Sequence, residues 1–298
     1  MKKVFITGSS GFVGSNLLIE CAKKNIECIA GSRKLYGDLV KQDHWETFLT
    51  GCDVVVHLAA RVHVMDETDS DPLSAFRKTN VEATLKIARA AKKSGIKRFI
   101  YISSIKVNGE FTYDKPFSSS DTPNPQDPYG ISKMEAEQEL LKLQEDTIFE
   151  IVIIRPPLIY GPGVKANFEK LLRLVQKNIP LPFGSVHNKR SLVSVYNLCS
   201  LIINCFDNPA ASGEIFLVSD DHDYSLKALI GLMAGVSNKK PILLPIPVSL
   251  MNFTAKILSK QDYADRLFGN LHVDIYKTKS LLNWQPPVSF RETYSQKN

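Results

Sequence analysis

Two side chains four residues apart have the types needed for proton transfer. They are Tyr129 and Lys133, in the run Asp127-Pro128-Tyr-Gly-Ile-Ser-Lys. Asp127 suits the N-cap of a helix and Pro128 its first turn, so the run predicts a helix with both side chains on one face. A nearby ammonium group favours the phenolate and would lower the pKa of Tyr129 from its usual value of about 10. The pair is a candidate acid–base couple, although an exposed coincidence stays open on this spacing alone.

A glycine-rich turn near the N-terminus offers a cofactor site. The run from Thr7 to Gly14 follows the apolar segment Val4–Thr7 and opens the amphipathic segment Gly11–Lys24. Its glycines suit a tight turn, a close approach of backbone to a pyrophosphate, and close packing of helix on strand. This context predicts dinucleotide binding, although a plain glycine turn fits the motif alone. The expected contacts are Gly8, Ser10, Gly11, Phe12, Val13 and Gly14.

The residues after the second apolar run bear on the choice of dinucleotide. An acid there holds the ribose 2′-hydroxyl of NAD, whereas an arginine accommodates the 2′-phosphate of NADP. Ser32, Arg33 and Lys34 supply no acid and two cations. They favour NADP(H), with NAD(H) open, unless these cations are only solvated loop charges. Loops at the same sheet edge are expected to add Asp38, Leu39, Leu58, Ala59 and Ala60; Asp38 could accept from the adenine amino group or form an ordinary turn.

Short apolar runs alternate with amphipathic segments through the first half of the chain. The expected strands include 26–30, 53–58, 98–103 and 149–154, and the expected helices include the long segment 73–93. Such alternation predicts an α/β fold with a parallel sheet covered on both faces. Ser104 follows a strand at the ligand-binding edge, where it could hold a substrate oxygen or simply form a turn. The long loop 106–126 is a candidate functional segment.

Proline and glycine punctuation after Arg155 predicts a second, interleaved lobe. The dinucleotide domain is expected to comprise residues 1–162 plus about 188–220. We assign 190–195, the helix 197–208 and the strand 213–218 to that domain. The smaller lobe is expected to comprise about 163–187 plus 221–298.

Composition narrows the functional class. The 298 residues are 44% hydrophobic and 23% charged with a net charge of +6, and no clustered basic face is visible. We therefore expect phosphate-bearing small ligands rather than nucleic acid. The five cysteines form no Cys-x-x-Cys, which favours free thiols in a reducing compartment and no metal site. No apolar run approaches the roughly 20 residues that span a bilayer, so we expect a soluble cytoplasmic protein without a membrane partner.

The glycine turn, Ser104, Tyr129 and Lys133 together resemble the extended short-chain dehydrogenase/reductases, over nearly the whole chain. The resemblance implies a Rossmann-type doubly wound parallel sheet with a smaller C-terminal substrate lobe. It implies that Ser104 and Tyr129 grip the substrate oxygen, that Tyr129 moves its proton, and that Lys133 lowers the Tyr129 pKa and holds the nicotinamide ribose. It also implies a mostly structural Asn80 and a cofactor contact at Pro156.

The smaller lobe resembles the sugar-nucleotide branch of this family. The run from Arg155 to Gly163 carries the likeness, as do Asn167, Arg190 and Arg266. The likeness implies that these last three residues hold the nucleotide diphosphate and the sugar, and a guanidinium fork suits phosphate oxygens. Surface or ion-paired arginines are the alternative. The family also implies a homodimer through a four-helix contact of segments 85–91 and 134–143.

Three reactions share these parts. Ser104 is followed by Ile105 and Lys106, where 4,6-dehydratases carry an Asp-Glu pair, so we set dehydration aside. Runs 57–63, 103–109 and 160–168 resemble a bacterial UDP-glucose 4-epimerase-like subgroup, which includes reductases of UDP-2-acetamido-2,6-dideoxy-4-keto-hexoses in surface polysaccharide synthesis. Asn108 replaces the tyrosine of typical epimerases.

We therefore expect a UDP-sugar oxidoreductase acting at C4. Arg33 favours an NADPH-dependent 4-ketoreductase, and the alternative is a UDP-hexose 4-epimerase with tightly bound NAD. A non-catalytic NADP(H) sensor is a remote third class, because such proteins typically lack the tyrosine and the lysine.

Overall fold

The computed structural model describes residues 2–62, 71–144, 148–164, 167–177, 179–236 and 238–295, without the side chain of Asn167. Up to the end of the fifth strand the elements are β1 (Lys3–Thr7), α1 (Phe12–Lys23), β2 (Glu27–Gly31), α2 (Arg33–Tyr36), α3 (Glu46–Leu49), β3 (Val54–His57), α4 (Pro72–Arg77), the π-helical η1 (Lys78–Glu82), α5 (Ala83–Lys93), β4 (Arg98–Ile102), the 3₁₀ turn η2 (Ile105–Val107), α6 (Pro128–Gln144) and β5 (Glu150–Arg155). The remaining elements are β6 (Leu158–Tyr160), α7 (Asn167–Gln176), β7 (Arg190–Ser194), α8 (Val195–Asn204), the 3₁₀ turn η3 (Pro209–Ala211), β8 (Ile215–Leu217), β9 (Asp223–Tyr224), α9 (Leu226–Val236), α10 (Val248–Ile257), α11 (Gln261–Phe268), α12 (Tyr276–Leu282) and α13 (Phe290–Ser295).

A six-stranded sheet in the order β2-β1-β3-β4-β5-β8 forms the larger part of the molecule, and each neighbouring pair is parallel. From β2 the chain crosses β1 to reach β3, so the strand order reverses between β1 and β3. Thr7 at the end of β1 is in register with Gly31 of β2 and His57 of β3. Ligands bind in the crevice at such a switch point. The predicted doubly wound parallel sheet is confirmed.

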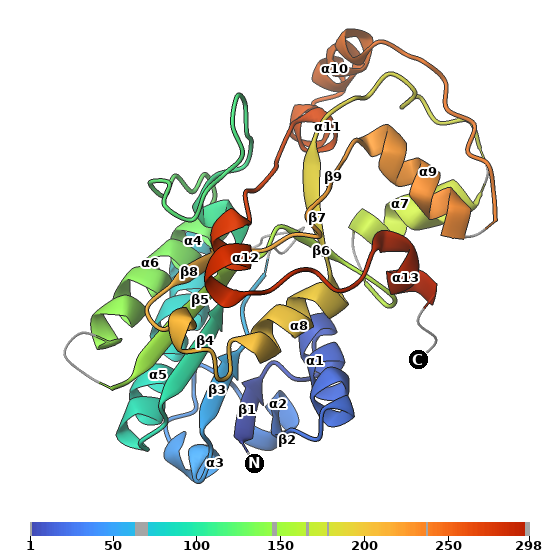
Figure 1. Ribbon diagram of the computed structural model, residues 1–298. Helices are drawn as coiled ribbons and strands as arrows, with labels where there is room; N and C mark the ends of the chain where they lie inside the picture. The colour runs from blue at the N-terminus through green and yellow to red at the C-terminus, as the bar shows by residue number, and fades with distance from the viewer. Residues whose placement is uncertain are drawn as a thin grey trace.

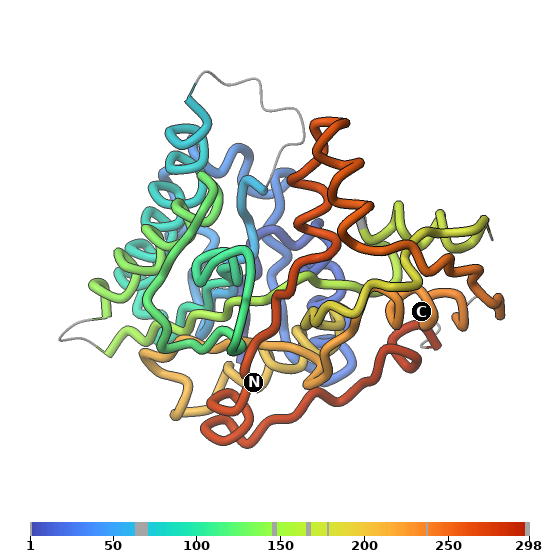
Figure 2. Tube along the Cα trace, turned by 90° about the horizontal axis from the view of Figure 1, so that it is seen from above, coloured from blue at the N-terminus to red at the C-terminus, as the bar shows by residue number. Residues whose placement is uncertain are grey.

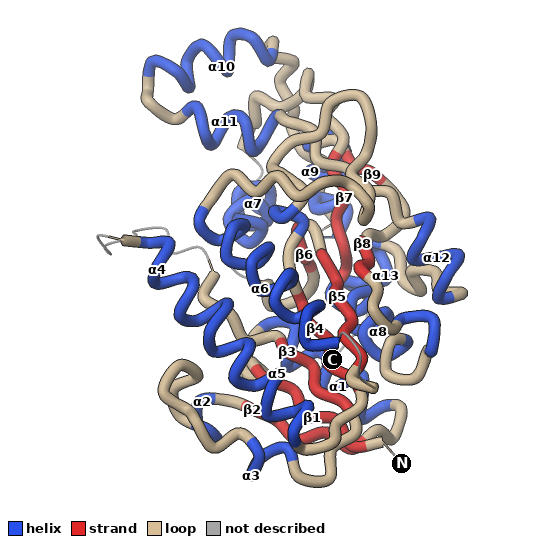
Figure 3. The backbone as a smooth tube through the Cα atoms, turned by 90° about the vertical axis from the view of Figure 1, so that its left-hand side faces the viewer, coloured by secondary structure: helices blue, strands red, loops and turns tan. Residues whose placement is uncertain are grey.

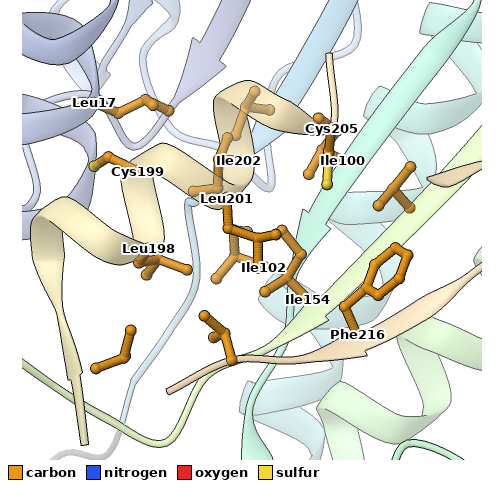
Figure 4. Close-up of a cluster of buried hydrophobic side chains, with 14 of the residues drawn as sticks. Leu17, Ile100, Ile102, Ile154, Leu198, Cys199, Leu201, Ile202, Cys205 and Phe216 are labelled. Carbon is orange, nitrogen blue, oxygen red and sulfur yellow. The ribbon is translucent and has the colours of Figure 1, made fainter. Parts of the chain in front are cut away.

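Alternate strand residues supply two separate cores, because successive side chains point to opposite faces. Phe5 and Val55 face α5 and α6, whereas Val4, Ile6 and Val54 face α1 and α8. Figures 1 and 3 show these helix pairs on the two sides of the sheet. Figure 4 shows the apolar contact of α8 with the sheet. The side chains of Leu198, Leu201 and Ile202 pack among those of β4, β5 and β8. Buried apolar contacts on this face therefore support the sheet whose carboxyl ends carry the predicted ligand-binding loops.

The second sheet, β6-β7-β9, has three strands, with β7 parallel to β6 and antiparallel to β9. Segment 190–195, assigned to the dinucleotide domain, thus pairs in this smaller sheet, although Val193 and Val195 pack in the core that contains α1 and α8. Leu192 and Val193 are as buried as a central strand of the large sheet would be, so burial pattern alone does not identify the pairing partner. Helices α7, α9 and α10 pack beside this sheet around the buried side chains of Phe168, Leu226, Ile230, Met233 and Met251.

The C-terminal part of the chain returns to the large sheet. Leu271, Val273, Ile275, Leu282 and Trp284 all belong to the core that contains α1 and α8. Thr278 of α12 donates a hydrogen bond to the carbonyl of Leu217 in β8 at 2.6 Å. Segment 271–284, expected in the smaller lobe, thus packs with the dinucleotide half. Within the described ranges, no helix combines the length and apolar character needed to cross a membrane.

Candidate active site

Helix α6 carries the predicted acid–base pair. The Asp127 carboxylate accepts the Gly130 N–H at 2.7 Å, which is the helix cap that the sequence predicted. Lys133 is buried, and its Nζ donates to the carbonyl of Ile102, at the end of β4, at 2.8 Å. The same ammonium lies 5.9 Å from the ring centroid of Tyr129. The helix cap and the strand end therefore bring the two residues to one place at the carboxyl edge of the sheet.

Ser104 completes this group. It caps the 3₁₀ turn η2, where its Oγ accepts the Lys106 N–H at 3.3 Å. Its side chain lies near enough to the phenol of Tyr129 to lower the pKa of that group. Ser104, Tyr129 and Lys133 are thus neighbours in space, and two hydroxyl groups meet where a substrate oxygen could accept from both.

The titration of the pair differs from the expectation. Burial raises the pKa of Tyr129 to about 12, the Ser104 side chain opposes the rise, and the Asp127 carboxylate adds to it. Burial lowers the pKa of Lys133 to about 7, against the attraction of Glu137. Burial therefore outweighs the lowering of the Tyr129 pKa that we expected from Lys133, because the low-dielectric surroundings disfavour both charges.

A buried ion pair that the sequence did not reveal lies behind Lys133. Arg155, at the end of β5, contacts the Glu137 carboxylate through Nε at 3.0 Å and Nη2 at 2.5 Å. Its Nη1 donates to Asn108 Oδ1 at 2.9 Å, and both members of the pair are almost fully buried. Because Glu137 is one helical turn beyond Lys133, the pair fixes α6 against β5 at the site. An arginine ending the otherwise apolar run of β5 was the available signal.

The glycine turn has the shape that a pyrophosphate needs. Gly8 has a φ of +65°, and a Cβ there would lie 2.8 Å from the Ala59 nitrogen. A Cβ on Gly14 would lie 2.4 Å from the Gly8 oxygen, so helix α1 packs against the turn at closest approach. Gly11 is the N-cap of α1 and supplies no side-chain cap. The first N–H groups of α1 are therefore available to an anion, and Ser10, Phe12 and Val13 surround them.

A hydrogen-bonded relay below the turn joins β1 to β3. Thr7 Oγ1 accepts the N–H groups of Leu58 and Ala59, each at 3.2 Å, so its own proton goes to His57 Nδ1 at 2.8 Å. His57 Nε2 then donates to Thr84 Oγ1 at 3.0 Å. Burial and the Lys133 charge lower the pKa of His57 to about 3, so the ring stays neutral. This relay, which positions the loop that contains Ala60, escaped the sequence analysis.

Asn80 lies in the π-helical turn and joins two loops. Its Oδ1 accepts the Arg61 N–H at 2.8 Å, and its Nδ2 donates to Ser132 Oγ at 3.0 Å. Ser132 in turn donates to the Tyr129 carbonyl at 2.8 Å. The expected structural role of Asn80 has a physical basis here, because the side chain links the loop after β3 to the catalytic helix.

The end of β2 presents Arg33 to solvent. Arg33 is the exposed first residue of α2, directly after Ser32 at the N-cap. Asp38 accepts the Val40 N–H at 2.8 Å, so its carboxylate makes an ordinary local turn. Leu39 is buried, and the ring of Tyr36 packs on Trp45 with centroids 4.9 Å apart. An exposed guanidinium thus stands beside the glycine turn, and no carboxylate occupies the end of β2.

The smaller lobe brings two of the sugar-site candidates together. Arg190 Nη1 donates to the carbonyls of Arg266 at 2.8 Å and Gly269 at 3.1 Å. The Arg266 side chain is exposed on α11. Asn167 begins α7, and its side chain lies outside the described part; His63, from the first of the three subgroup runs, lies outside the described residues altogether. Arg190 thus anchors the α11 segment.

The long loop after Ser104 connects the site to the C-terminal segment. Lys106 Nζ binds Glu110 at 3.0 Å and also the Asp127 carboxylate, which holds the start of the loop on α6. Further along, Thr112 Oγ1 hydrogen-bonds His272 Nδ1 at 2.7 Å, and Phe117 pairs with the same segment through its backbone. Figure 2 shows this green loop beside the orange-red segment around residue 272.

Pro156 and the glycine turn lie at the same edge of the sheet. Pro156 directly follows β5, and its carbonyl accepts the Ile105 N–H at 3.0 Å. The ring of Phe12 lies close to the segment after Pro156, because a Cβ added at Gly161 would be 3.6 Å from its Cζ atom. The predicted cofactor and catalytic residues therefore converge on one region from β1, β3, β4 and β5.

A glycine turn at a switch point, with Ser104, Tyr129 and Lys133 at the adjacent strand ends, defines a dinucleotide-dependent enzyme of the short-chain dehydrogenase/reductase class. Residues 4–219 match the model of the NAD dependent epimerase/dehydratase family. The chain belongs to that family, and it is an NAD(P)-dependent nucleotide-sugar enzyme.

Individual relatives agree with this placement. A UDP-glucose 4-epimerase of Vibrio cholerae is 45% identical over 99% of this chain and 94% of its own length. An N-acetyl-alpha-D-glucosaminyl-diphospho-ditrans,octacis-undecaprenol 4-epimerase of Escherichia coli O157:H7 is 30% identical over 86% of this chain and 80% of its own length. The solved UDP-glucose 4-epimerase of Thermotoga maritima with UDP-glucose has a TM-score of 0.76 and 20% identity, covering 98% of this chain and 96% of that one.

Proposed function

We propose that this protein is a UDP-hexose 4-epimerase. The observation that carries the proposal is the 45% identity, over nearly both full lengths, to a protein named UDP-glucose 4-epimerase. This relative favours the alternative over the NADPH-dependent 4-ketoreductase that we expected from Arg33. The arginine does not oppose epimerisation, because a 2′-phosphate distinguishes the two dinucleotides and not the direction of hydride transfer.

The chain's own residues are arranged to move a proton at the C4 oxygen of a hexose. Ser104 would hold that oxygen by a hydrogen bond, while Tyr129 takes the hydroxyl proton during oxidation and returns it during reduction. The positive charge of Lys133 would favour the phenolate. A bound nicotinamide dinucleotide would supply the group that accepts and returns the C4 hydride. The glycine turn, the uncapped start of α1 and Arg33 are the residues that would hold it, and we infer a preference for the 2′-phosphorylated form from Arg33.

The substrate diphosphate is proposed to bind Arg266, with Arg190 and Asn167 as further contacts. Arg266 is the exposed guanidinium of the set, whereas Arg190 already donates to two backbone carbonyls of the α11 segment. We also propose a dinucleotide domain of residues 1–162 plus about 188–220 and a smaller lobe of about 163–187 plus 221–298. Segment 271–284 is the exception, because it packs in the core that contains α1 and α8. We also propose a homodimer through α5 and α6, since the family often uses these helices.

The test asks whether the protein alone converts a UDP-hexose to its C4 epimer. Purified protein is incubated with UDP-glucose or UDP-N-acetylglucosamine, and NMR follows the C4 epimer. Epimer formation without added reductant is the expected result. No epimer from either sugar would contradict the proposal.

A second candidate, the 4-ketoreductase, is favoured by Asn108, which replaces the tyrosine of typical epimerases. Asn108 is buried. Its Oδ1 accepts a hydrogen bond from Arg155 Nη1 at 2.9 Å, and its Nδ2 donates to the Ser118 carbonyl at 2.8 Å. Stoichiometric NADPH oxidation with a UDP-4-keto-hexose, without epimerisation, would establish this candidate instead.

A further inference from the structure

Exposed apolar side chains are concentrated at one end of the molecule. Among the described residues, nine of the eighteen exposed large hydrophobic side chains fall within residues 236–267. Single exposed apolar residues are ordinary on a protein surface, whereas a contiguous group marks an interaction site. The group centres on α10 and α11, which pack against each other at the outer end of the smaller lobe (Figures 1 and 3).

Helix α10 turns one apolar face into the lobe and a second one outward. Met251 is buried in the lobe core. Leu250, Phe253 and Ile257 recur at intervals of three and four residues, so they share a different face. Their exposed fractions are 51, 61 and 65%, and that of Leu258, at the turn into α11, is 68%. These four residues form what we term the α10 outer face. The buried side anchors the helix, so the outer face is a fixed surface rather than a frayed end.

Helix α10 and the segments that flank it carry only positive charge, whereas the neighbouring α11 adds Asp262, Asp265 and Arg266. Residues 224–261 contain no aspartate or glutamate and five lysines. Lys256 lies on α10, and Lys260 follows the turn with its Nζ 5.4 Å from the ring centroid of Tyr263. A lysine stem can cover apolar surface while its ammonium group reaches a polar layer. Apolar side chains beside such lysines are typical of helices that lie in a membrane interface.

We propose that the α10 outer face docks on an anionic phospholipid surface. Positive charge and exposed Phe, Leu and Ile together complement phosphate headgroups above acyl chains. A second copy of this chain fits less well, because a two-fold contact through this face would bring the same lysines together. The proposal does not depend on which reaction the enzyme performs. It revises the expectation of no membrane partner, while surface docking requires no spanning helix.

The test measures co-sedimentation of the full chain with vesicles. One preparation contains phosphatidylglycerol and phosphatidylcholine in equal parts, and the other contains phosphatidylcholine only. We expect the protein to bind the anionic vesicles at low salt and to bind the neutral ones at least about 10-fold more weakly. The double substitution Phe253→Ser/Ile257→Ser should weaken anionic binding about 10-fold or more, and Lys256→Gln/Lys260→Gln should do likewise.

The matched control is Tyr113→Ser/Ile148→Ser, which removes two apolar side chains that are 82 and 84% exposed elsewhere. Its binding should stay within about twofold of the wild type, because the control leaves the docking face intact. All the substituted positions are exposed, so thermal unfolding should confirm that each variant folds. The proposal is overturned if the wild type leaves anionic vesicles unbound, or if the control loses as much binding as the α10 variant. A concentration-dependent dimer that Phe253→Ser/Ile257→Ser converts to monomer would also overturn it, in favour of a second copy.

Discussion

Tyr129 is neutral near pH 7, and Lys133 loses its charge as the pH rises through that value. The phenol has a pKa of about 12 and the ammonium one of about 7, each moved by burial toward the uncharged form. Proton abstraction requires the opposite state, in which Tyr129 is ionised and Lys133 is charged. The pH dependence of the reaction should therefore report both groups.

The first prediction is a rising limb that ends near pH 7. Below that pH Lys133 stays charged while the phenolate fraction grows about tenfold per pH unit. Above it, the loss of the Lys133 charge cancels the growth, so kcat/KM should level off. Lys133→Arg keeps its charge, and its kcat/KM should continue to rise above pH 7. Rate profiles from pH 5 to 9 check this, with dinucleotide affinity as the control for folding. A break at the same pH in Lys133→Arg would contradict the assignment.

The second prediction concerns the phenol itself. Tyr129→Phe removes the transferable proton and leaves the ring, so kcat should fall by about 100-fold or more. Cofactor affinity should change little, and Ser104→Ala is the comparison that removes the neighbouring hydroxyl, with its cap of η2, and leaves the phenol in place. Steady-state kinetics with dinucleotide titration measure both quantities. Near-wild-type turnover of Tyr129→Phe would refute general acid–base catalysis by this residue.

The third prediction separates NADP from NAD. Arg33→Ala should weaken binding of the 2′-phosphorylated dinucleotide by about 10-fold or more and leave NAD(H) within about twofold, since only one ligand offers the phosphate. Lys34→Ala is the matched control one residue away. Isothermal titration with both dinucleotides gives the ratio. Equal effects on both would show that Arg33 is a solvated loop charge.

At the scale of elements, the contact between α6 and β5 depends on a buried ion pair. The side chains of Arg155 and Glu137 are 2 and 3% exposed. Removing one partner leaves the other charge buried and unpaired, whereas replacing both with apolar residues leaves an apolar contact. We predict that Arg155→Met destabilises the protein by about 3–5 kcal/mol and that Arg155→Met/Glu137→Leu recovers much of this. Urea unfolding of both variants is the measurement. Equal destabilisation of the single and double variants would show that the ion pair itself is not what matters.

Much of this element arrangement could be predicted from the sequence, and the reason is physical. Parallel strands covered on both faces are apolar throughout, as in Val54–Val56. The start of the helix that carries Tyr129 is recognisable because Asp127 is a favoured N-cap residue. Which strands pair with each other could not be predicted in this way. Nothing in the local pattern of Arg190–Ser194 distinguishes the three-stranded sheet from the larger one. The Arg155–Glu137 pair joins residues 18 positions apart, which only the folded packing reveals.

At the scale of the whole molecule, the loop after Ser104 couples the site to the C-terminal segment. Thr112 and His272 hydrogen-bond at 2.7 Å, 160 residues apart in sequence. We predict that Thr112→Val raises the KM for the UDP-sugar by about 5- to 10-fold, because the hydroxyl bonds both His272 Nδ1 and the His272 N–H. Dinucleotide affinity should stay within about twofold, because the glycine turn lies on other strands. Unchanged KM would show that the loop keeps its place without these bonds.

The return of residues 271–284 to the large core has a consequence for synthesis on the ribosome. The face of the sheet beneath α1 needs α8, Leu282 and Trp284 to close it. A nascent chain that has emerged only as far as β5 exposes this face, although all the catalytic side chains are already outside the exit tunnel. Folding of the first half is therefore completed only when residues 271–284 have been synthesised, and we expect nascent chains stalled after β6 to be protease-sensitive and dependent on chaperones.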